Sequence, residues 1–379
     1  MIIGIDASRA TKLNKTGVEW YAYHVIENLV KIDSQNNFVL YIKDQPDEWL
    51  KKIGERANVK IKRLRWPFKF LWTQKRLSWE MLLNPPDVLF IPASAIPFIH
   101  PKNTIVTIHD VGFMAYPQSY DRWQRWYQTW STRLAIKHAK KIITISEFSK
   151  QEIIKYFITP LVPPLGKGGG NSADKIVVTY LGYDKKKFNT DAARNDDVLK
   201  KYSITRPYLL FVGRLERKKN IAGLVRAFGG GVTLVLAGRP GYGWSEAEKI
   251  IADKNLQKNI IITGYVSEED LPALYRGATA LVFPSFYEGF GLPVLEAFAC
   301  GTPVICSNAA SLPEIAGEAA LLVAPDDANA IAEAMERIVI NETLRGELTY
   351  KGRERLQRFN WQRCGEKTMA ILLKVNSDK

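Results

Sequence analysis

The chain has 379 residues, of which 46% are hydrophobic and 24% are charged, and its formal net charge is +14. This length favours two domains of ordinary size, and the composition is that of a globular protein with a buried core. The sequence has no apolar run of 18 residues and no signal-peptide pattern at its start, so we expect a cytoplasmic protein rather than a membrane-spanning or secreted one.

The positive charge is concentrated in the first half of the chain. Residues 1–190 contain 29 Lys and Arg against 16 Asp and Glu, whereas residues 191–379 contain 24 against 23. Residues 51–150 alone contain 18 basic against 6 acidic residues. This asymmetry predicts an anionic partner for the N-terminal half.

The first half alternates short apolar runs with helical patterns, which predicts a parallel sheet covered by helices. The expected strands are residues 2–6, 38–42, 59–64, 87–91, 104–108, 141–145 and 175–182. A helical pattern follows Gly17. His109 and Asp110 come directly after the strand at 104–108. Polar residues at the carboxyl end of a parallel strand lie where open α/β sheets bind ligands, so His109 is a candidate site residue.

Two segments combine aromatic residues with Lys and Arg at helical spacing. The first places a set of apolar residues on one predicted helical face: Phe68, Leu71, Trp72, Trp79, Leu82 and Leu83. The second is a stripe of Trp123, Trp126, Tyr127, Trp130 and Leu134, with Arg122, Arg125 and Arg133 nearby. In one interpretation both helices pack on the sheet, and we favour this for most of the aromatic residues.

The other interpretation of these segments is an interfacial surface. A basic helix with Trp on its apolar side suits an anionic membrane, so residues 51–150 would make the protein peripheral on the inner face of the plasma membrane. A nucleic-acid partner is not expected, because no recognised binding motif accompanies the charge.

Two segments set the expected domain boundaries. Residues 159–171 are rich in Pro and Gly, and we expect a mobile surface insertion there. Residues 191–206 are polar and predict the linker between a first domain at 1–190 and a second domain at 207–360.

The second half opens with a buried-strand pattern at residues 208–212, followed by a glycine and a basic loop. This loop contains Arg214 and Lys219 and leads into a helix. Backbone N–H groups and fixed cations at such a turn bind a diphosphate, which makes both residues candidates.

The densest set of candidate residues follows a strand at residues 280–283. The loop after it carries Glu288, Gly289, Phe290 and Gly291, and Leu292 then opens a helix that contains Glu296. Glycine lets the backbone approach a ligand closely, and a helix N-terminus attracts an anion. This loop therefore predicts a ligand site with two carboxylates.

The segment EGFGLPVLEAFACGTPVI, with seven residues between Glu288 and Glu296, resembles the signature of family-4 retaining glycosyltransferases of the GT-B fold, the glycosyl transferases group 1. The resemblance implies an α/β architecture of two Rossmann-like doubly wound domains facing across a cleft, with residues 361–379 crossing back onto the first. It implies a hexosyltransferase that moves a hexose, with retention, from a nucleotide-sugar to a glycan or lipid-linked acceptor in cell-surface polysaccharide synthesis. Bacterial mannosyltransferases are the nearest resemblance, so GDP-mannose is the first expected donor and a UDP-sugar the next.

The resemblance also implies roles for individual residues around the transferred sugar. The family has a Gly-Arg pair and a Lys five residues later, which correspond to Arg214 and Lys219 here, and these two would neutralise the departing diphosphate. Lys218 is the alternative cation if the register shifts by one. His109 would position the sugar. Glu288 would bind the sugar's hydroxyls together with the loop amides that follow it, those of Gly289, Phe290 and Gly291.

Further roles concern the nucleotide. The helix that begins at Leu292 would face the diphosphate, and Glu296 would accept hydrogen bonds from the ribose. Tyr265 and Val266 would contact the base through their backbone, and Gly17 would touch the donor phosphate or the acceptor. No DxD-like motif ends a strand, so we expect neither a metal nor a cofactor, and the nucleotide-sugar is a co-substrate.

Two other classes stay open at this point. A GT-B sugar-nucleotide epimerase would share the two domains, and a non-enzymatic basic protein would bind a membrane or nucleic acid. A glycosidase is not favoured, because a phosphate-binding Arg and Lys pair has no use in its two-carboxylate chemistry.

Overall fold

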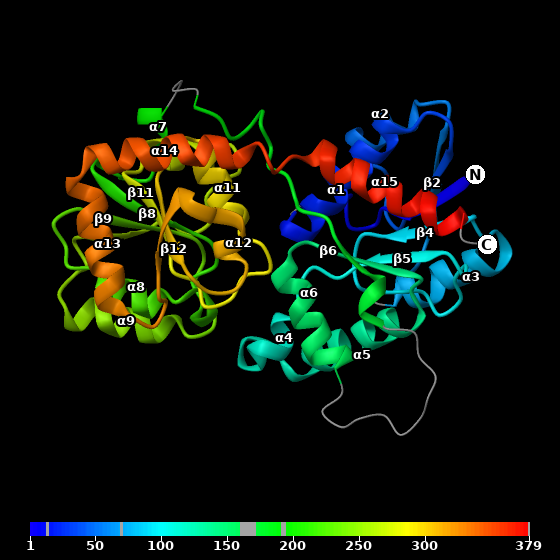
Figure 1. The fold of residues 1–379 in the computed structure, drawn as a ribbon, viewed down its shortest axis with the longest axis horizontal. Helices are drawn as coiled ribbons and strands as arrows, with labels where there is room; N and C mark the ends of the chain where they lie inside the picture. Colours follow the sequence, from blue (N-terminus) through cyan, green and yellow to red (C-terminus); the bar gives the residue numbers. More distant parts are fainter. Residues whose placement is uncertain (13–14, 69–70, 160–171, 191–194, 378–379) are drawn as a thin grey trace. The chain divides into compact units, whose positions relative to one another are not determined.

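The computed structural model describes residues 1–12, 15–68, 71–159, 172–190 and 195–377. Two compact units divide the chain: unit 1 comprises Met1–Gly182 and Asn360–Lys379, and unit 2 comprises Tyr183–Phe359. Each unit contains one parallel sheet with helices on both faces (Figure 1). The predicted α/β class with two Rossmann-like doubly wound sheets is confirmed. Each unit is described by itself.

The described part of unit 1 holds a seven-stranded sheet in the order β3-β2-β1-β4-β5-β6-β7. Its strands are β1 (Ile2–Asp6), β2 (Asn37–Ile42), β3 (Val59–Arg63), β4 (Val88–Ile91), β5 (Thr104–Thr107), β6 (Lys141–Thr144) and β7 (Ile176–Val178). The first six agree with the predicted runs within a residue at each end, whereas β7 is much shorter than predicted. The order runs outward from β1 on one side and from β4 on the other, so the loops after β1 and β4 flank the switch point of the sheet.

Helices cover both faces of the unit 1 sheet. They are α1 (Gly17–Ile32), α2 (Glu48–Gly54), α3 (Ser78–Leu83), α4 (Gly112–Ala115), α5 (Arg122–His138), α6 (Glu147–Ile153) and α15 (Trp361–Ser377), with π-helical turns at Trp72–Leu77 and Ile154–Ile158. α15 packs on α1, and Figure 1 shows both above the sheet and α4, α5 and α6 below it. Gly365 permits the close contact, because a Cβ there would lie 2.7 Å from Asn28 Cβ.

The described part of unit 2 holds a six-stranded sheet in the order β10-β9-β8-β11-β12-β13. Its strands are β8 (Tyr208–Val212), β9 (Thr233–Ala237), β10 (Ile260–Ile262), β11 (Ala280–Phe283), β12 (Val304–Ser307) and β13 (Ala320–Val323). Every residue of β8, β11 and β12 is buried, as expected for central strands covered on both faces. The switch point lies between β8 and β11, which are neighbours in the sheet although they are far apart in the chain.

The helices of unit 2 form two layers around its sheet. They are α7 (Asn195–Lys201), α8 (Ile221–Ala227), α9 (Trp244–Asp253), α10 (Leu271–Gly277), α11 (Leu292–Ala299), α12 (Leu312–Ala316), α13 (Ala328–Ile340) and α14 (Glu342–Leu356). α8 packs on α9 and α13, whereas α11 packs on α10, α12 and α14. Figure 1 shows α8 and α9 below the sheet and α11 and α14 above it.

The division between the units falls earlier than the predicted boundary at residue 190. Part of the predicted linker is helix α7, which packs against α10 within unit 2. Lys201 Nζ lies 2.6 Å from Asp270 Oδ2, and Tyr202 donates a hydrogen bond to the same carboxylate at 2.8 Å. These contacts attach residues 195–206 to the second unit. The polar composition that predicted a linker belongs here to a largely exposed helix. Residues 191–194 and 160–171, which include most of the predicted Pro/Gly-rich insertion, lie outside the described residues.

The first aromatic segment does not form the single helical face predicted for it. The π-helical turn at Trp72–Leu77 shifts the helical phase, so Trp72 is buried and donates a hydrogen bond to the Leu64 carbonyl at 2.8 Å. Four other residues of that set are exposed: Phe68, Trp79, Leu82 and Leu83. Packing on the sheet was also the wrong expectation for Trp123 and Trp126, whereas Tyr127 and Trp130 are half-buried.

Candidate functional site

The loops after β8 and β11 meet at the carboxyl edge of the unit 2 sheet. They are neighbours because β8 pairs with β11, so the basic loop and the Glu288 loop lie on the two sides of the switch point. The Lys219 ammonium forms an ion pair with Glu288 across 69 residues of sequence. Both side chains are largely buried, with 16% of Lys219 and 13% of Glu288 exposed. The structure thus brings a predicted diphosphate-binding residue and a predicted sugar-binding residue together.

The basic loop is held against the loop after β9 by close backbone packing. The Gly213 N–H donates to the Ala237 carbonyl at 3.0 Å, and Gly213 has a φ of +140°. A Cβ at Gly238 would lie only 1.8 Å from the Gly213 carbonyl oxygen, so that position requires glycine. This packing leaves the Arg214 side chain exposed at the sheet edge.

Lys219 is distinguished from its neighbour Lys218 by its partner. Lys218 Nζ lies 3.3 Å from Glu216 Oε1, whereas Lys219 pairs with Glu288 and lies 5.3 Å from the centre of the Phe283 ring. The next residue, Asn220, caps α8 by accepting a hydrogen bond from the Gly223 N–H at 3.2 Å. The cap sets where the helix starts, directly after Lys219. The choice of Lys219 over Lys218 as the phosphate-binding cation stays a prediction.

The loop from Glu288 to Gly291 is shaped by one buried hydroxyl. Ser311 Oγ lies 2.9 Å from the carbonyl oxygen of Glu288 and 2.7 Å from that of Phe290. The Phe290 ring packs on Phe359 with 5.9 Å between ring centres and the residue is buried, so this side chain is part of the core. Ser311 was not among the predicted site residues, because nothing local in the sequence shows that its hydroxyl reaches this loop.

Gly291 is the residue that turns the loop into α11. Its φ of +113° lies in the region that favours glycine, and a Cβ would lie 2.7 Å from Leu312 Cδ2. Leu292 is then the first residue of α11. Gly289 is buried within the same loop. The N-terminus of α11 and its positive dipole end therefore begin directly after the Glu288 loop.

Glu296 lies one turn further along α11 and accepts a hydrogen bond from the Tyr275 hydroxyl at 2.8 Å. Burial raises the pKa of Glu296 to about 6, although the Tyr275 hydrogen bond and the nearby charge of Lys187 act against this shift. Lys187 Nζ itself lies 3.2 Å from Glu268 Oε2. Tyr275 and Lys187 were both missed from the sequence. Tyr275 reaches Glu296 because α10 packs on α11, and Lys187 comes from the segment before α7, far from Glu296 in the chain.

Tyr265 and Val266 follow β10, the edge strand of the unit 2 sheet. Tyr265 is 61% exposed, and the Arg239 guanidinium lies 5.3 Å from the centre of its ring. Val266 is buried. The two residues thus lie at the carboxyl edge beyond the loop after β9.

Unit 1 contributes a polar pocket of about 400 Å³ at the carboxyl ends of its central strands. Its walls come from the loops after β1, β4 and β5 and from α1, α4 and α5. The lining residues are Arg9, Thr16, Val18, Glu19, Ala93, Ser94, His109, Asp110, Phe113, Tyr120, Gln124, Gln128 and Thr132. Gln128 Oε1 is buried and has no hydrogen-bond partner among the described residues.

His109 lines this pocket as a half-buried side chain. Its Nε2 lies 3.4 Å from the Pro92 carbonyl oxygen, and the Tyr21 ring meets it edge-on with 4.7 Å between ring centres. Burial lowers the pKa of His109 below its ordinary value, because a charged imidazolium is poorly solvated there. At neutral pH the ring is therefore neutral, which suits positioning of a sugar rather than neutralisation of a phosphate.

Glu19 is a buried carboxylate that the sequence analysis did not identify. Arg9 and Lys12 form ion pairs with it at 3.3 and 3.0 Å, and the Thr16 N–H donates to it at 3.2 Å. Burial opposes its ionisation, but the hydrogen bonds from Thr16 and Lys12 outweigh burial and lower the pKa of Glu19 to about 2. The spacing from Thr16 to Glu19 is a capping-box pattern, which was the available signal.

Gly17 is the first residue of α1, between the pocket residues Thr16 and Val18. It is exposed, and a Cβ added to it would have no atom within 4 Å. Neither packing nor backbone angle requires glycine here, so the predicted contact of Gly17 with a ligand stays a prediction. Gly17 and His109 belong to unit 1, and all other predicted site residues belong to unit 2.

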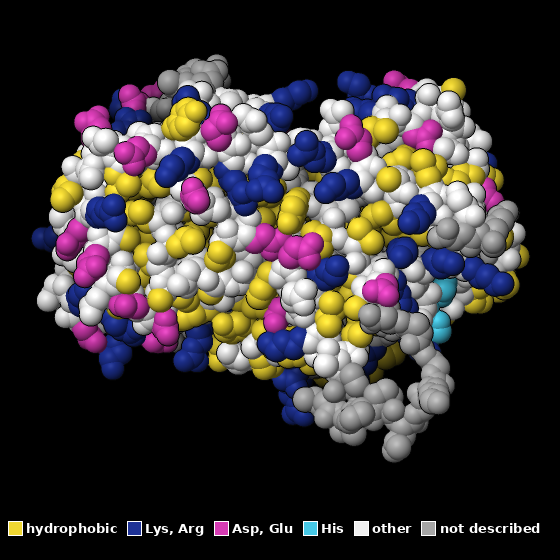
Figure 2. Space-filling view, viewed as in Figure 1, with side chains coloured by type: hydrophobic (Ala, Val, Ile, Leu, Met, Phe, Trp, Pro, Cys, Tyr) yellow, Lys and Arg dark blue, Asp and Glu magenta, His cyan; other side chains and the backbone are white. Residues whose placement is uncertain are grey.

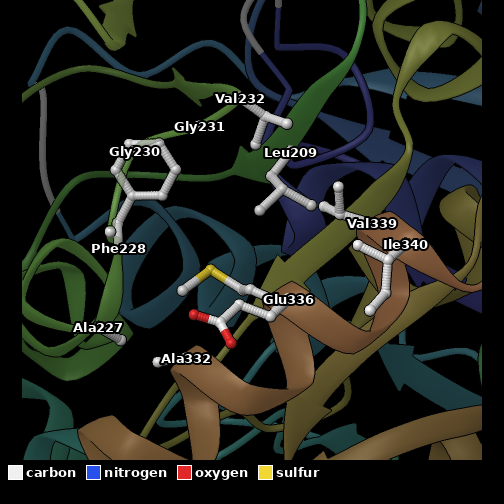
Figure 3. Close-up of a pocket in the computed structure, with 12 residues that line it drawn as sticks. Leu209, Ala227, Phe228, Gly230, Gly231, Val232, Ala332, Glu336, Val339 and Ile340 are labelled. Atoms are coloured by element: carbon white, nitrogen blue, oxygen red, sulfur yellow. The ribbon is translucent and has the colours of Figure 1, made fainter.

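A second, apolar pocket of about 320 Å³ lies in unit 2. Figure 3 shows Phe228, Leu209 and Val232 around it, with the Glu336 carboxylate on the α13 side. Leu209 is near the start of β8 and Val232 directly precedes β9, so this pocket lies at the amino edge of the sheet. It is separate from the Lys219 and Glu288 pair at the carboxyl edge. In the described ranges, no group of three His, Cys, Asp or Glu residues is placed to hold a metal ion.

Comparison with known proteins identifies the family. The profile described as Glycosyl transferases group 1 matches residues 195–355, and that described as Glycosyltransferase Family 4 matches residues 15–164. O-antigen chain mannosyltransferase B of Escherichia coli is 34% identical over 276 residues, which cover 71% of this chain and 69% of that protein. The chain belongs to the group 1, family 4 glycosyltransferases. The resemblance carried by the Glu288 segment is thereby confirmed.

Other glycosyltransferases match with lower identity. The serotype-specific mannosyltransferase WbdA of Escherichia coli is 28% identical over 72% of this chain, which spans only 33% of that protein. The solved sucrose-phosphate synthase of Thermosynechococcus elongatus superimposes with a TM-score of 0.74 at 22% identity over 100% of both chains. HepE of Anabaena in complex with UDP-glucose gives 0.69 at 16% identity, covering 100% of this chain and 99% of its own. These two structures share the GT-B fold with this glycosyltransferase.

Proposed function

We propose that this glycosyltransferase is a retaining hexosyltransferase that transfers mannose from GDP-mannose to a hydroxyl of a glycan or lipid-linked acceptor in cell-surface polysaccharide synthesis. The observation that carries the proposal is the Lys219–Glu288 pair beside the N-terminus of α11. A cation, a carboxylate and a helix N-terminus at the switch point of a parallel sheet match the needs of a diphosphate joined to a sugar. The mannosyltransferase names of two matched relatives support mannose, and a UDP-sugar is the next candidate.

The chemical task is to stabilise a departing nucleoside diphosphate. The bond between the sugar's anomeric carbon and the β-phosphate oxygen breaks, and the acceptor oxygen bonds to the same face of that carbon. The acceptor's proton passes to the departing phosphate, so no protein nucleophile is needed. Arg214, Lys219 and the start of α11 neutralise the charge that develops on the phosphate. Lys219 has three N–H donors, so it can hold Glu288 and a phosphate oxygen together.

The remaining unit 2 residues bind the rest of the donor. Glu288 and the amides of Gly289, Phe290 and Gly291 receive the sugar's hydroxyls. The ionised Glu296 accepts hydrogen bonds from the ribose, and its pKa of about 6 keeps it ionised at neutral pH. The exposed Tyr265 offers a surface for the base, with the Val266 backbone beside it.

The polar pocket of unit 1 is proposed as the acceptor side. It combines hydrogen-bonding groups of both kinds, which suits the hydroxyls of a sugar. Gln128 Oε1 has no partner within the described part of the chain, so an acceptor hydroxyl that donates to it would remove an unsatisfied polar atom. His109 helps to position the transferred sugar, and Gly17 leaves space for a ligand at the start of α1. No metal or cofactor is part of the proposed reaction.

We place the enzyme in the cytoplasm, peripheral on the inner face of the plasma membrane. Across the described ranges, no helix has both the length and the apolar character needed to cross a bilayer. A peripheral position would give the enzyme access to nucleotide-sugars and to a lipid-linked acceptor at once.

Thermal stabilisation by nucleotides tests the donor assignment. The purified protein is melted without added metal in the presence of GDP, UDP, ADP, TDP and their sugars. A ligand at 100 times its Kd adds about 2.7 kcal/mol of stability, which is readily seen as a higher Tm. GDP-mannose is expected to give the largest shift among the sugars. A larger Tm shift with a UDP-sugar would change the donor assignment from GDP-mannose to that UDP-sugar. The absence of any shift would contradict the proposed donor site.

A further inference from the structure

Helix α5 presents two different faces within unit 1. Gln124, Gln128 and Thr132 repeat every four residues and line the polar pocket beside His109. Trp123 and Trp126 lie about half a helical turn away from these positions at 100° per residue, on the outer side of the helix. One helix therefore separates the proposed acceptor pocket from an outward aromatic face.

The outward face of α5 exposes two tryptophan side chains to solvent. Trp123 is 80% exposed and Trp126 is 60% exposed. The Trp126 ring stacks on Trp130 with 6.2 Å between centres and an interplanar angle of 6°, and Trp123 meets Trp126 edge-on at 6.3 Å. The rings form an ordered row, and leaving indoles in water costs free energy that an apolar environment would recover.

The row continues from α5 towards α3. Trp130 contacts the Phe98 ring at 6.0 Å, and Phe98 and Ile99 are both exposed. The Ile99 N–H donates to Ser78 Oγ at 3.2 Å, which places this loop at the first residue of α3. Leu82 lies one turn from Ser78 on the same side of α3 and is 54% exposed. We call the set Leu82, Phe98, Ile99, Trp123 and Trp126 the α3–α5 surface.

Basic residues accompany the α3–α5 surface. Arg122, Arg125 and Arg133 are exposed on α5. Residues 51–150 have 18 Lys and Arg against 6 Asp and Glu. One of those acids, Glu80, is buried and paired with Lys62, and another, Asp121, caps the start of α5. On the face seen in Figure 2, acidic side chains gather mainly over unit 2, at the left, whereas Lys and Arg occur over both units.

We propose that the α3–α5 surface docks on an anionic phospholipid bilayer. Indole rings favour the headgroup layer, where an apolar body and a polar N–H are both accommodated, and guanidinium groups pair with lipid phosphates. Docking would hold the polar pocket about one helix diameter, roughly 10 Å, from the lipid, because only α5 lies between them. This inference rests on the proposed function in one respect: a lipid-linked acceptor would then reach the pocket without leaving the bilayer.

Vesicle co-sedimentation tests the surface without donor or acceptor, so its result is independent of the donor assignment. The full chain is mixed with vesicles of phosphatidylethanolamine and phosphatidylglycerol, or with vesicles of phosphatidylcholine alone. The first variant is Arg122→Glu with Arg125→Glu, and the second is Trp123→Ser with Trp126→Ser. Matched controls on exposed positions of α14 in unit 2 are Lys351→Glu with Arg353→Glu, and Tyr350→Ser.

The wild-type protein is expected to bind the anionic vesicles and to prefer them to phosphatidylcholine. Each arginine near a charged bilayer contributes about fivefold to binding, so the double arginine variant should bind at least about 25-fold more weakly. The double tryptophan variant should lose binding as well, while both controls bind like wild type. Circular dichroism melts with unchanged Tm show that each variant is folded.

Three results would overturn the proposal. The first is no binding of the wild-type protein to anionic vesicles, and the second is wild-type binding by the two α5 variants. The third is that a partner other than lipid covers the α3–α5 surface and the protein does not bind vesicles. That partner would be a second copy of the chain if the tryptophan variant abolishes a dimer in solution. It would be duplex DNA if the arginine variant abolishes DNA binding. Failure here with a GDP-mannose thermal shift intact would leave the proposed transfer reaction standing.

Discussion

At the scale of single residues, the Lys219–Glu288 pair decides how the donor site works. The two residues meet because their loops follow neighbouring strands, and both side chains are largely buried. Water screens a charge poorly at such a position, so Lys219 acts strongly on a phosphate placed beside it. Lys218, one position earlier, is engaged with Glu216 and provides a natural control.

Replacing Lys219 with Ala is expected to lower kcat by roughly 10²–10³, the usual loss when a charge partner of the transition state is removed. Arg214→Ala should behave in the same way, because both cations face the departing phosphate in the proposed reaction. Initial rates with GDP-mannose measure the effect, and Lys218→Ala should retain most of the activity. A larger loss with Lys218→Ala than with Lys219→Ala would show that the register had been assigned to the wrong lysine.

The pH dependence of donor binding should report Glu296. Its pKa in the free protein is raised to about 6, so the carboxylate becomes protonated as the pH falls through 6 and can no longer accept both ribose hydrogen bonds. GDP-mannose affinity should therefore weaken below pH 6, by at most about tenfold per pH unit. Calorimetric titration at several pH values measures this change in affinity. The ligand itself does not titrate in this range, because the terminal phosphate of GDP-mannose is esterified to the sugar.

The Glu296→Gln variant is the control for this prediction. It should bind GDP-mannose more weakly at pH 7 and show a flat profile between pH 5 and 7. The free wild-type protein should also lose some stability as the pH rises from 4.5 through 6, because a folded pKa above the unfolded value favours the protonated form. An unchanged pH profile in the variant would assign the titration to another group.

At the scale of elements, the turn from β11 into α11 depends on a glycine that cannot be exchanged. Gly291→Ala would place a Cβ 2.7 Å from Leu312 and force a φ of +113° on alanine. We expect a loss of about 1–3 kcal/mol in unfolding free energy and a higher KM for GDP-mannose, because the loop amides shift. Thermal melts and initial rates measure the two effects.

Gly346→Ala is the matched control for the turn. Gly346 lies inside α14, is exposed, and has nothing within 4 Å of an added Cβ. Alanine there should stabilise the protein by about 0.5–1 kcal/mol, because the unfolded chain loses freedom that the helix does not need. If both variants had the same stability, the strained backbone at Gly291 would not be the cause of any change in KM.

At the scale of the whole molecule, the chain's last helix completes its first unit. α15 packs on α1 and buries Trp361, Met369, Leu372 and Val375. Each large apolar side chain contributes about 1.5–3 kcal/mol, so removal of α15 would cancel most of the 5–15 kcal/mol that stabilises a typical domain. Deleting residues 361–379 should therefore unfold unit 1.

Unit 2 should survive that deletion. Its sheet and the Lys219–Glu288 pair lie wholly within residues 183–359, so GDP-mannose should still raise the Tm of the remaining transition in calorimetry. If the shortened chain instead shows no unfolding transition that GDP-mannose stabilises, both units have been lost together, and the units do not fold separately.

The sequence by itself determined the class of fold and the main motif. Short apolar runs and helical spacing are local patterns, so most strands were placed to within a residue. The segment that contains Glu288 and Glu296 carried the resemblance to the family that the comparisons confirmed. Helical spacing gave the wrong prediction for the first aromatic segment, from Phe68 to Leu83. The π-helical turn at Trp72–Leu77 there changes which side chains face the core.

The tertiary structure alone decided which distant residues meet. The pairing of β8 with β11 brings Lys219 to Glu288, and the packing of α10 on α11 places Tyr275 against Glu296. Ser311 reaches the Glu288 loop in the same way. Strand order and helix packing are set by the burial of whole faces rather than by neighbours in the chain. For that reason the exposed row on α5 and the pocket behind it became visible only in the folded protein.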